Sequence, residues 1–311
     1  MAESVLLEDV CTLGGHLNTV NSVAFGPDGA TAASAATDTK VMLWDLRARA
    51  AKKTFADHSF AVYSLSFSPN GAEVASGSWD KKIVVRKVHS DDRPIVLSGH
   101  ENWVNCVSYS HKGDLLCSAS LDSTAKIWKP ALGKCVLSLP FPGTYVWAAA
   151  FSPDGRHLWT GSQDHHVRIW DLSTHQCTAT MKGHTDNVRA IAPSPTDPHL
   201  WASGSWDGTV RLWNDRSKEC VATLTGHAKD VRGLSFAPNG RFIASASKDG
   251  SLRVWSVPAG RCLLTKERVH DTSDGAFAVA FSPDGRHVLS GGDDCAVKLF
   301  RVSGCGSAPD K

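Results

Sequence analysis

Histidines and aspartates, the residue types best suited to acid–base chemistry, recur through this chain at nearly constant spacing. Aspartates that close a tight turn are separated by 42, 42, 42, 43, 42 and 45 residues, at Asp38, Asp80, Asp122, Asp164, Asp207, Asp249 and Asp294. A histidine paired with a carboxylate can transfer a proton near neutral pH. A histidine accompanies these aspartates in most repeats. Because such histidine–aspartate pairs recur with the repeat, they indicate a structural role, and we expect no catalytic residues.

The other candidate ligands and nucleophiles follow the same repeat or lack a partner. Cys135, Cys177, Cys220 and Cys262 are separated by 42, 43 and 42 residues, and the chain has no C-x-x-C motif. Equivalent positions of successive repeats lie too far apart to share one ion. The adjacent His165 and His166 point to opposite faces of an extended segment. Neither a glycine-rich phosphate loop nor an H-E-x-x-H motif occurs. The sequence therefore predicts reduced thiols, no metal, no cofactor and no enzymatic activity.

The elements that position these residues are short strands. Segments such as 210–213 and 231–236 are rich in β-branched and aromatic residues and are bounded by Gly, Pro, Asn and Asp. Turns such as Gly26–Gly29 and Ser152–Gly155 place a proline second and a glycine last, which favours a chain reversal. The position six residues after each repeated aspartate holds Trp44, Arg86, Trp128, Trp170, Trp213, Trp255 and Phe300. A period of about 40–45 residues with this ending is typical of a propeller blade.

These features resemble the WD40 repeat family over residues 4 to 302. The resemblance implies an all-β fold, a seven-bladed propeller in a single domain of residues 1–303, with a short flexible tail at 304–311. The last repeat provides only three strands, and an unassigned strand-like segment, Val5 to Leu13, precedes the first repeat. In the family the N-terminal strand completes the last blade, and closing the ring in this way removes exposed sheet edges.

The resemblance also implies a buried hydrogen-bonded tetrad of His, Ser, Asp and Trp in four blades. Its members are His16, Ser34, Asp38 and Trp44 in blade one; His100, Ser118, Asp122 and Trp128 in blade three; His184, Ser203, Asp207 and Trp213 in blade five; and His227, Ser245, Asp249 and Trp255 in blade six. Blade two has Arg86 in place of the tryptophan, and blade four has Pro142 at the histidine position. Blade seven has Phe300 in place of the tryptophan, and its His270 lies two positions early. We expect these three blades to form but to be held less tightly.

In the same family, three positions per blade project onto the narrow "top" rim and the mouth of the channel. Aromatic residues occupy seven of these 21 positions, whereas aromatic residues make up 8% of the chain. Aromatic and arginine side chains are enriched at interface hot spots. The rim residues expected to bind a partner, suited to an acidic or C-terminal peptide with an apolar anchor, are Tyr63, Trp79, Trp103, Tyr145, Trp147, Arg189, Trp206, Arg232, Lys248 and Phe277.

Composition narrows the class of partner. The 311 residues carry a net charge of +2, so a clustered basic stripe for nucleic acid is not expected. No apolar segment approaches the length of a membrane span, and the first ten residues do not resemble a secretion signal. The sequence predicts a cytoplasmic scaffold or adaptor subunit of a larger assembly that binds proteins; the nucleus and the cilium are compatible. The alternative is a substrate receptor of a cullin-4-type ubiquitin ligase, because W-D/N-x-R boxes occur at Trp44–Arg47 and Trp213–Arg216.

Overall fold

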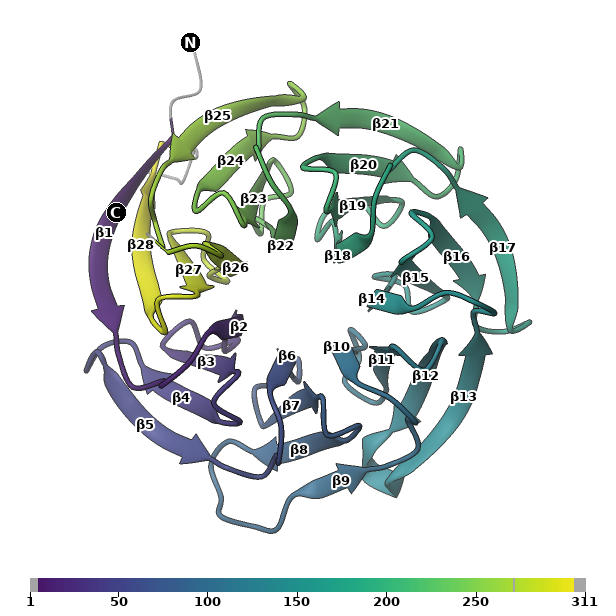
Figure 1. Cartoon of the computed structure of the whole chain (residues 1–311), viewed down its shortest axis with the longest axis horizontal. Helices are drawn as coiled ribbons and strands as arrows, with labels where there is room; N and C mark the ends of the chain where they lie inside the picture. Colours follow the sequence, from purple (N-terminus) through teal and green to yellow (C-terminus); the bar gives the residue numbers. More distant parts are fainter. Residues whose placement is uncertain (1–4, 271, 305–311) are drawn as a thin grey trace.

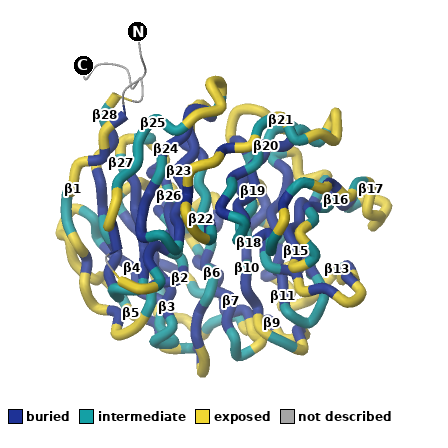
Figure 2. Tube along the Cα trace, turned by 45° about the horizontal axis from the view of Figure 1, so that its top comes forward, coloured by how far each residue is buried: buried dark blue, intermediate teal, exposed yellow. Residues whose placement is uncertain are grey.

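Seven four-stranded antiparallel sheets form a ring around a central channel (Figure 1). The computed structural model describes residues 5–270 and 272–304. The predicted tail at 304–311 lies outside the described residues apart from Gly304. The innermost strand of each sheet lines the channel and is partly buried, the second strand is the most buried, and the outermost strand faces solvent (Figure 2). The seven-bladed propeller expected from the repeat is confirmed.

The strands of the first four blades have the following bounds. Blade one contains β2 (Val20–Phe25), β3 (Thr31–Ala36), β4 (Val41–Asp45) and β5 (Ala50–Phe55). Blade two contains β6 (Val62–Phe67), β7 (Glu73–Ser78), β8 (Ile83–Lys87) and β9 (Ile95–Leu97). Blade three contains β10 (Val104–Tyr109), β11 (Leu116–Ser120), β12 (Thr124–Lys129), the 3-10 turn η1 (Pro130–Leu132) and β13 (Lys134–Pro140). Blade four contains β14 (Val146–Phe151), β15 (His157–Ser162), β16 (Val167–Asp171) and β17 (Gln176–Met181).

The remaining blades follow the same order. Blade five contains β18 (Val188–Pro193), β19 (Leu200–Ser205), β20 (Val210–Asn214) and β21 (Glu219–Leu224). Blade six contains β22 (Val231–Phe236), β23 (Phe242–Ser247), β24 (Leu252–Ser256) and β25 (Arg261–Lys266). Blade seven contains β26 (Ala276–Phe281), β27 (His287–Gly292), β28 (Val297–Ser303) and β1 (Leu6–Leu13). No helix among the described residues is long and apolar enough to cross a membrane.

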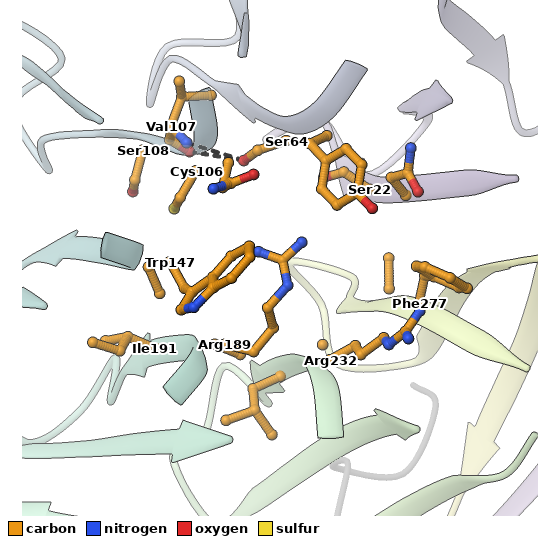
Figure 3. Close-up of a pocket in the computed structure, with 18 of the residues that line it drawn as sticks. Ser22, Ser64, Cys106, Val107, Ser108, Trp147, Arg189, Ile191, Arg232 and Phe277 are labelled. Carbon is orange, nitrogen blue, oxygen red and sulfur yellow. Dashed lines mark hydrogen bonds between the residues drawn. The ribbon is translucent and has the colours of Figure 1, made fainter. Parts of the chain in front are cut away.

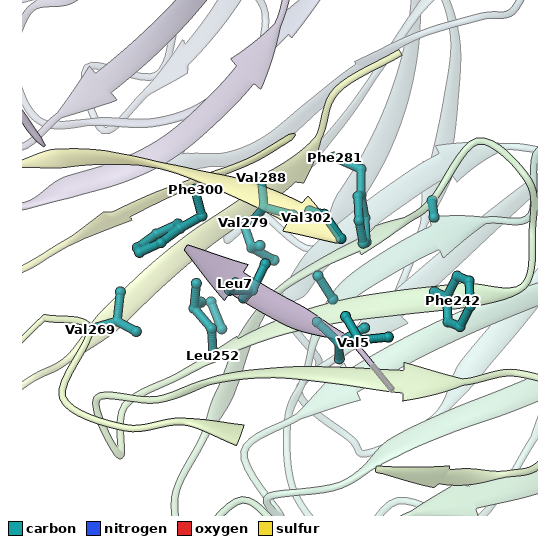
Figure 4. Packing of buried hydrophobic residues seen from close by; sticks show 14 of the residues in the cluster. Val5, Leu7, Phe242, Leu252, Val269, Val279, Phe281, Val288, Phe300 and Val302 are labelled. Carbon is teal, nitrogen blue, oxygen red and sulfur yellow. The ribbon is translucent and has the colours of Figure 1, made fainter. Parts of the chain in front are cut away.

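The N-terminal strand closes the ring, as predicted. β1 pairs antiparallel with β28, from Leu6 opposite Ser303 to Leu13 opposite Val297, with an irregularity between Asp9 and Cys11. Val5 and Leu7 are buried in one cluster with Phe242, Phe300 and Val302 (Figure 4). The first strand of the chain therefore supplies the outer strand of the last blade and packs against blade six.

Small residues allow neighbouring blades to pack closely. The residue that follows the tetrad serine or threonine in the second strand is Ala35, Gly77, Ala119, Gly161, Gly204, Ala246 or Gly291. A Cβ atom added at Gly161 would lie 2.6 Å from a methyl carbon of Val188, in the innermost strand of the next blade. Such a contact is far below van der Waals separation, so at position 161 only glycine permits this approach.

Candidate functional site at the channel mouth

The four predicted tetrads form, and they hold each blade together beneath the rim. In blade six the His227 Nε2 atom lies 2.7 Å from Ser245 Oγ, and Trp255 Nε1 lies 2.8 Å from the same oxygen. His227 Nδ1 lies 2.9 Å from a carboxylate oxygen of Asp249. An ionised carboxylate can only accept, so His227 carries its proton on Nδ1, the serine donates to Nε2, and the indole donates to the serine. Blades one, three and five have the same bonds.

Blade two replaces the tryptophan with an ion pair. His58 still bonds to Ser76 and to Asp80, at 2.8 Å each. Arg86 turns toward Asp57, which its Nε and Nη2 atoms contact at 2.8 and 2.5 Å. Two parallel bonds of this kind are strong and directional. We expected blade two to be held less tightly because Arg86 replaces the tryptophan, and that expectation did not take the Arg86–Asp57 ion pair into account. The sequence signal was an acidic residue directly before His58.

Blade four replaces the missing histidine with Arg168. Its guanidinium donates to Ser162 Oγ at 2.6 Å and also binds the Asp164 carboxylate. Trp170 Nε1 donates to Thr160 at 3.2 Å. Asp164 thus pairs with Arg168 of the same sheet. Pro142, which stands at the histidine position, has no side chain that could bond to this carboxylate. In the sequence, the basic residue four positions after Asp164 could have indicated this ion pair.

His270 occupies the tetrad histidine position of blade seven, although it lies two residues early in the sequence. His270 Nδ1 lies 2.6 Å from Asp294, and Nε2 lies 2.8 Å from Ser290. Blade seven therefore contains the same triad as the other blades, without the tryptophan. The two additional residues lie in the loop between His270 and β26, so the histidine reaches the usual place through a longer connection.

The environment of the tetrads lowers the pKa of both the histidines and the aspartates. Burial lowers the pKa of His16, His100, His184 and His227 from the ordinary value of 6.5, more than the neighbouring carboxylate raises it. Burial opposes the shift at Asp249, but hydrogen bonds from His227 and Ser251 keep the pKa of Asp249 below its ordinary range. The folded protein therefore holds neutral imidazoles next to ionised carboxylates.

Stability is expected to fall as the pH is lowered from 7.5 to 5.5. The unfolded chain binds protons on these histidines more readily than the folded chain, so their contribution is complete above pH 6.5 and is lost below it, by at most about 1.4 kcal/mol per histidine and pH unit. Urea unfolding at the two pH values measures this loss. His227→Gln should reduce the pH dependence, and His111→Gln, at an exposed position, should leave it unchanged. Equal urea midpoints at pH 7.5 and 5.5 would contradict the assignment.

Above the tetrads, backbone hydrogen bonds fix the rim positions. In every blade the amide of the residue before the turn aspartate donates to the carbonyl of the residue before the innermost strand, as Trp79 does to Ala61 at 3.0 Å and Lys248 to Asp230 at 2.9 Å. The same bond joins the equivalent residues of the other five blades, at 2.9 or 3.0 Å. Two of the three predicted rim positions per blade are thereby placed together on one face of the ring.

Aromatic rings gather at one side of the channel mouth. Trp79 stacks on Tyr63, with ring centroids 4.7 Å apart, and on Trp103, at 3.9 Å. Trp147 contacts Trp206 with centroids 5.7 Å apart and donates from Nε1 to Asn187 at 3.1 Å. Tyr145 is 40% exposed beside them but does not line the channel. Blades two to five therefore present a nearly continuous aromatic surface.

The cationic rim residues have different environments. Lys248 binds Asp274 at 3.0 Å, and Arg232 lies over the Phe277 ring at 4.1 Å and 3.5 Å from Asp230. The guanidinium carbon of Arg189 lies 5.1 Å from the centroid of the Tyr63 ring and 4.9 Å from that of Trp147. Figure 3 shows Arg189 beside Trp147. Burial lowers the pKa of Arg189 from its ordinary value, although arginine keeps its charge in proteins. The three cations predicted to hold a carboxylate are thus not equivalent.

The cavity at the mouth has a volume of about 480 Å³. Of the ten predicted rim residues, eight line it, and Tyr145 and Lys248 do not. No aspartate or glutamate is among the described residues that line it. Asn105 and Cys106 on β10 also line the cavity, and burial raises the pKa of the Cys106 thiol. Asn105 occupies one of the 21 rim positions but was not among the residues expected to bind a partner, and Cys106 was missed. This site has the features of a binding surface, with cations, indole N–H groups and aromatic faces.

The residues considered for metal or redox chemistry lie apart from one another. The described part of the chain holds no group of three or more histidine, cysteine, aspartate or glutamate residues arranged to bind a metal. The eight cysteines within it are free thiols. His165 and His166 lie in the turn before β16, where His166 Nδ1 is 3.4 Å from Asp164.

The sequence model described as "WD domain, G-beta repeat" matches seven segments of the chain, which together cover most of its length. They are residues 7–45, 50–86, 93–129, 133–171, 175–214, 218–256 and 260–301. The chain belongs to the WD40 repeat family. The matched WD40 segments correspond one by one to successive repeats, and the first begins within β1, which completes blade seven.

Curated relatives match only a short part of this WD40 propeller. Nuclear distribution protein PAC1-2 of Uncinocarpus reesii is 41% identical over 69 residues, which is 22% of this chain and 14% of the relative. Nuclear distribution protein PAC1 of Coccidioides posadasii is 40% identical over 65 residues, 21% of this chain and 13% of the relative. WD repeat-containing protein 1 of Mus musculus is 34% identical over 70 residues, 22% of this chain and 11% of the relative. Membership of the WD40 family is consistent with a role in protein interaction.

Proposed function

We propose that this WD40 propeller is a non-enzymatic scaffold or adaptor subunit of a larger assembly in the cytoplasm, and that partner proteins bind its top rim. The observation that supports it most is an arc of exposed apolar side chains in four successive blades. Leu17 is 79% exposed, Phe60 61%, Trp103 38% and Tyr145 40%. Each lies in the loop that enters the innermost strand, on the rim face. Exposed apolar groups that cluster in this way are typical of interaction sites.

Charge divides the same face into two halves. The corresponding loops of blades five to seven carry Asp186, Lys229, Asp230 and Asp274 in place of large apolar residues. A partner that crosses the channel mouth would contact an apolar half and a charged half. Rigid aromatic anchors beside polar groups are the composition of interface hot spots.

Replacing Trp103 and Tyr145 with alanine should weaken partner binding by about 2 kcal/mol per side chain, because both are exposed anchors. We expect affinity purification followed by mass spectrometry to recover fewer partners with this double variant than with the native chain. The matched control is Lys112→Glu with Arg156→Glu, in turns on the opposite face of the ring. If the control loses the partners and the rim variant keeps them, the rim proposal is wrong.

A second candidate is the cullin-4 substrate receptor. Arg47 and Arg216 are both exposed, and their backbone amides donate to Asp45 and Asn214 at 2.9 and 3.0 Å. The second residue of each W-D/N-x-R box thus caps a turn, which leaves the arginine side chain available to a partner. Recovery of a cullin-4 adaptor that is lost with Arg47→Ala and Arg216→Ala would favour this candidate over the first.

A further inference from the structure

Arg189 crosses the mouth of the channel. It extends from β18 of blade five, and its guanidinium carbon lies 4.9 Å from the centroid of Trp147 in blade four and 5.1 Å from that of Tyr63 in blade two (Figure 3). Contact with two rings restricts the side chain to one position over the cavity. The charge is therefore held at the place where a group entering from the top face would arrive.

Within the part of the chain that the structure describes, Arg189 has no carboxylate partner. Arg232 and Lys248, the other rim cations, are paired with Asp230 and Asp274. A cation that is largely withdrawn from water and unpaired loses much of its solvation energy. An anion delivered by a ligand would restore that energy, so Arg189 is the rim cation with most to gain from a bound carboxylate.

A second observation indicates a ligand at the same cavity. Asn105 is only 4% exposed, and neither its amide nitrogen nor its amide oxygen has a partner among residues 5–270 and 272–304. Its counterpart in blade one, Asn21, donates to Thr37 and to the Val62 carbonyl, at 3.0 Å each. The Nε1 atoms of Trp79 and Trp206 are also buried without a partner among the described residues. Buried polar groups are rarely left unsatisfied, and at the wall of a cavity a bound ligand can satisfy them.

The geometry favours a carboxylate. The guanidinium carbon lies over the rings of Tyr63 and Trp147. No described carboxylate bonds to its N–H groups, so a planar carboxylate can bind them with two parallel bonds. A single unpaired cation matches a single negative charge. A phosphate, with nearly two negative charges at neutral pH, would require a second cation, and Arg232 is already paired.

We propose that the channel mouth binds one carboxylate group of a partner peptide, from an aspartate, a glutamate or a free C-terminus, through Arg189. Asn105 and the free indole N–H groups of Trp79 and Trp206 would bond to the peptide backbone beside it, and the aromatic stack would contact a neighbouring apolar side chain. The inference rests on the proposed function, because it assumes that partners approach the top face.

The test is fluorescence anisotropy of the full chain with fluorescein-labelled ten-residue glycine–serine peptides. One peptide carries tryptophan next to glutamate and another carries tryptophan next to glutamine, both with amidated ends. A third, without glutamate, ends in a free carboxylate, and a fourth carries phosphoserine in place of glutamate. We expect the glutamate or the C-terminal carboxylate peptide to bind at least about tenfold more tightly than the glutamine peptide, and Arg189→Met to abolish that difference. The comparison between these two peptides identifies the source of the carboxylate.

Matched variants separate charge from folding. Arg156→Met removes an exposed positive charge on the opposite face and should leave the preference unchanged. Arg189→Lys keeps the charge without the planar edge and should retain only part of the preference. If Arg189→Met lowers the melting temperature, Arg189→Gln replaces it. Equal affinity for glutamate and glutamine, no binding up to millimolar peptide, or tenfold tighter binding of the phosphoserine peptide would each overturn the inference.

The outcome is distinct from that of the proposed function. Partner capture that depends on Trp103 and Tyr145, together with no effect of Arg189→Met on any peptide, would retain the rim scaffold and reject the carboxylate site. Peptide selectivity that depends on Arg189, without loss of partners in the rim variant, would retain the carboxylate site and reject the rim scaffold.

Discussion

A chain that lacks residues 1–13 is expected to be largely insoluble or to unfold at much lower denaturant concentration than the native chain. The deletion removes the buried side chains of Val5, Leu7 and Leu13, which contribute on the order of 5 kcal/mol together. It also exposes the edge of β28, whose backbone groups would then be free to pair with another molecule. Total stabilities of native domains are typically about 5–15 kcal/mol, so this loss is a large share.

The soluble fraction after expression and guanidinium unfolding followed by circular dichroism measure this effect. A point variant tests the same contact without truncation: Leu13→Asp places an unpaired charge at a buried position and should cost about 3 kcal/mol or more. Thr12→Asp is the matched control, because Thr12 is the exposed neighbour on the same strand. A deletion variant that unfolds like the native chain would disprove the closure of blade seven by β1.

Ser245→Ala is expected to cost about 2–5 kcal/mol, more than the same change at Ser290. Both serines are fully buried. Loss of the Ser245 hydroxyl leaves His227 Nε2 and Trp255 Nε1 without a partner, and each buried polar atom left unpaired costs about 1–3 kcal/mol. In blade seven Phe300 stands in place of the tryptophan, so Ser290→Ala leaves only His270 Nε2 unpaired.

Equilibrium urea unfolding of the two variants measures the difference, which should be about 1–2 kcal/mol. Ser76→Ala provides a third comparison, because Arg86 replaces the tryptophan in blade two, and it should resemble Ser290→Ala. If all three variants lose the same stability, the indole bond contributes nothing and the tetrad acts as a triad in every blade.

The sequence repeat explains why the fold could be predicted. It also explains why the contacts found in single blades could not. The number of blades, the closure by β1 and the four tetrads follow from features that recur with the period, so each blade supports the assignment of the others. The substitutions occur where one blade departs from the repeat. Arg168 and Arg86 compensate through ion pairs with Asp164 and Asp57. In blade seven Lys298 makes a similar pair with the turn aspartate, Asp294.

The candidate site was predictable only in outline. The backbone positions of the rim are fixed by the repeat, but the direction of a long side chain is decided by its neighbours. Arg189 and Arg232 occupy equivalent positions in adjacent blades. Arg189 contacts Tyr63 of blade two and Trp147 of blade four, whereas Arg232 contacts Phe277 and Asp230. These contacts between blades have no periodic signal, so the sequence placed the cations together without distinguishing the unpaired one.

The pairing of β1 with β28 also has a consequence for the order of events during synthesis. Leu6 lies opposite Ser303, so the ribosome makes one partner almost a whole chain length before the other. At the usual elongation rate of about 5–20 residues per second, β1 waits roughly 15–60 s for its partner strand. Blades one to six can form from neighbouring segments in that interval, whereas blade seven cannot. Ring closure is therefore expected to be a late step of folding, before which Leu7 and Leu13 remain accessible to chaperones that bind apolar segments.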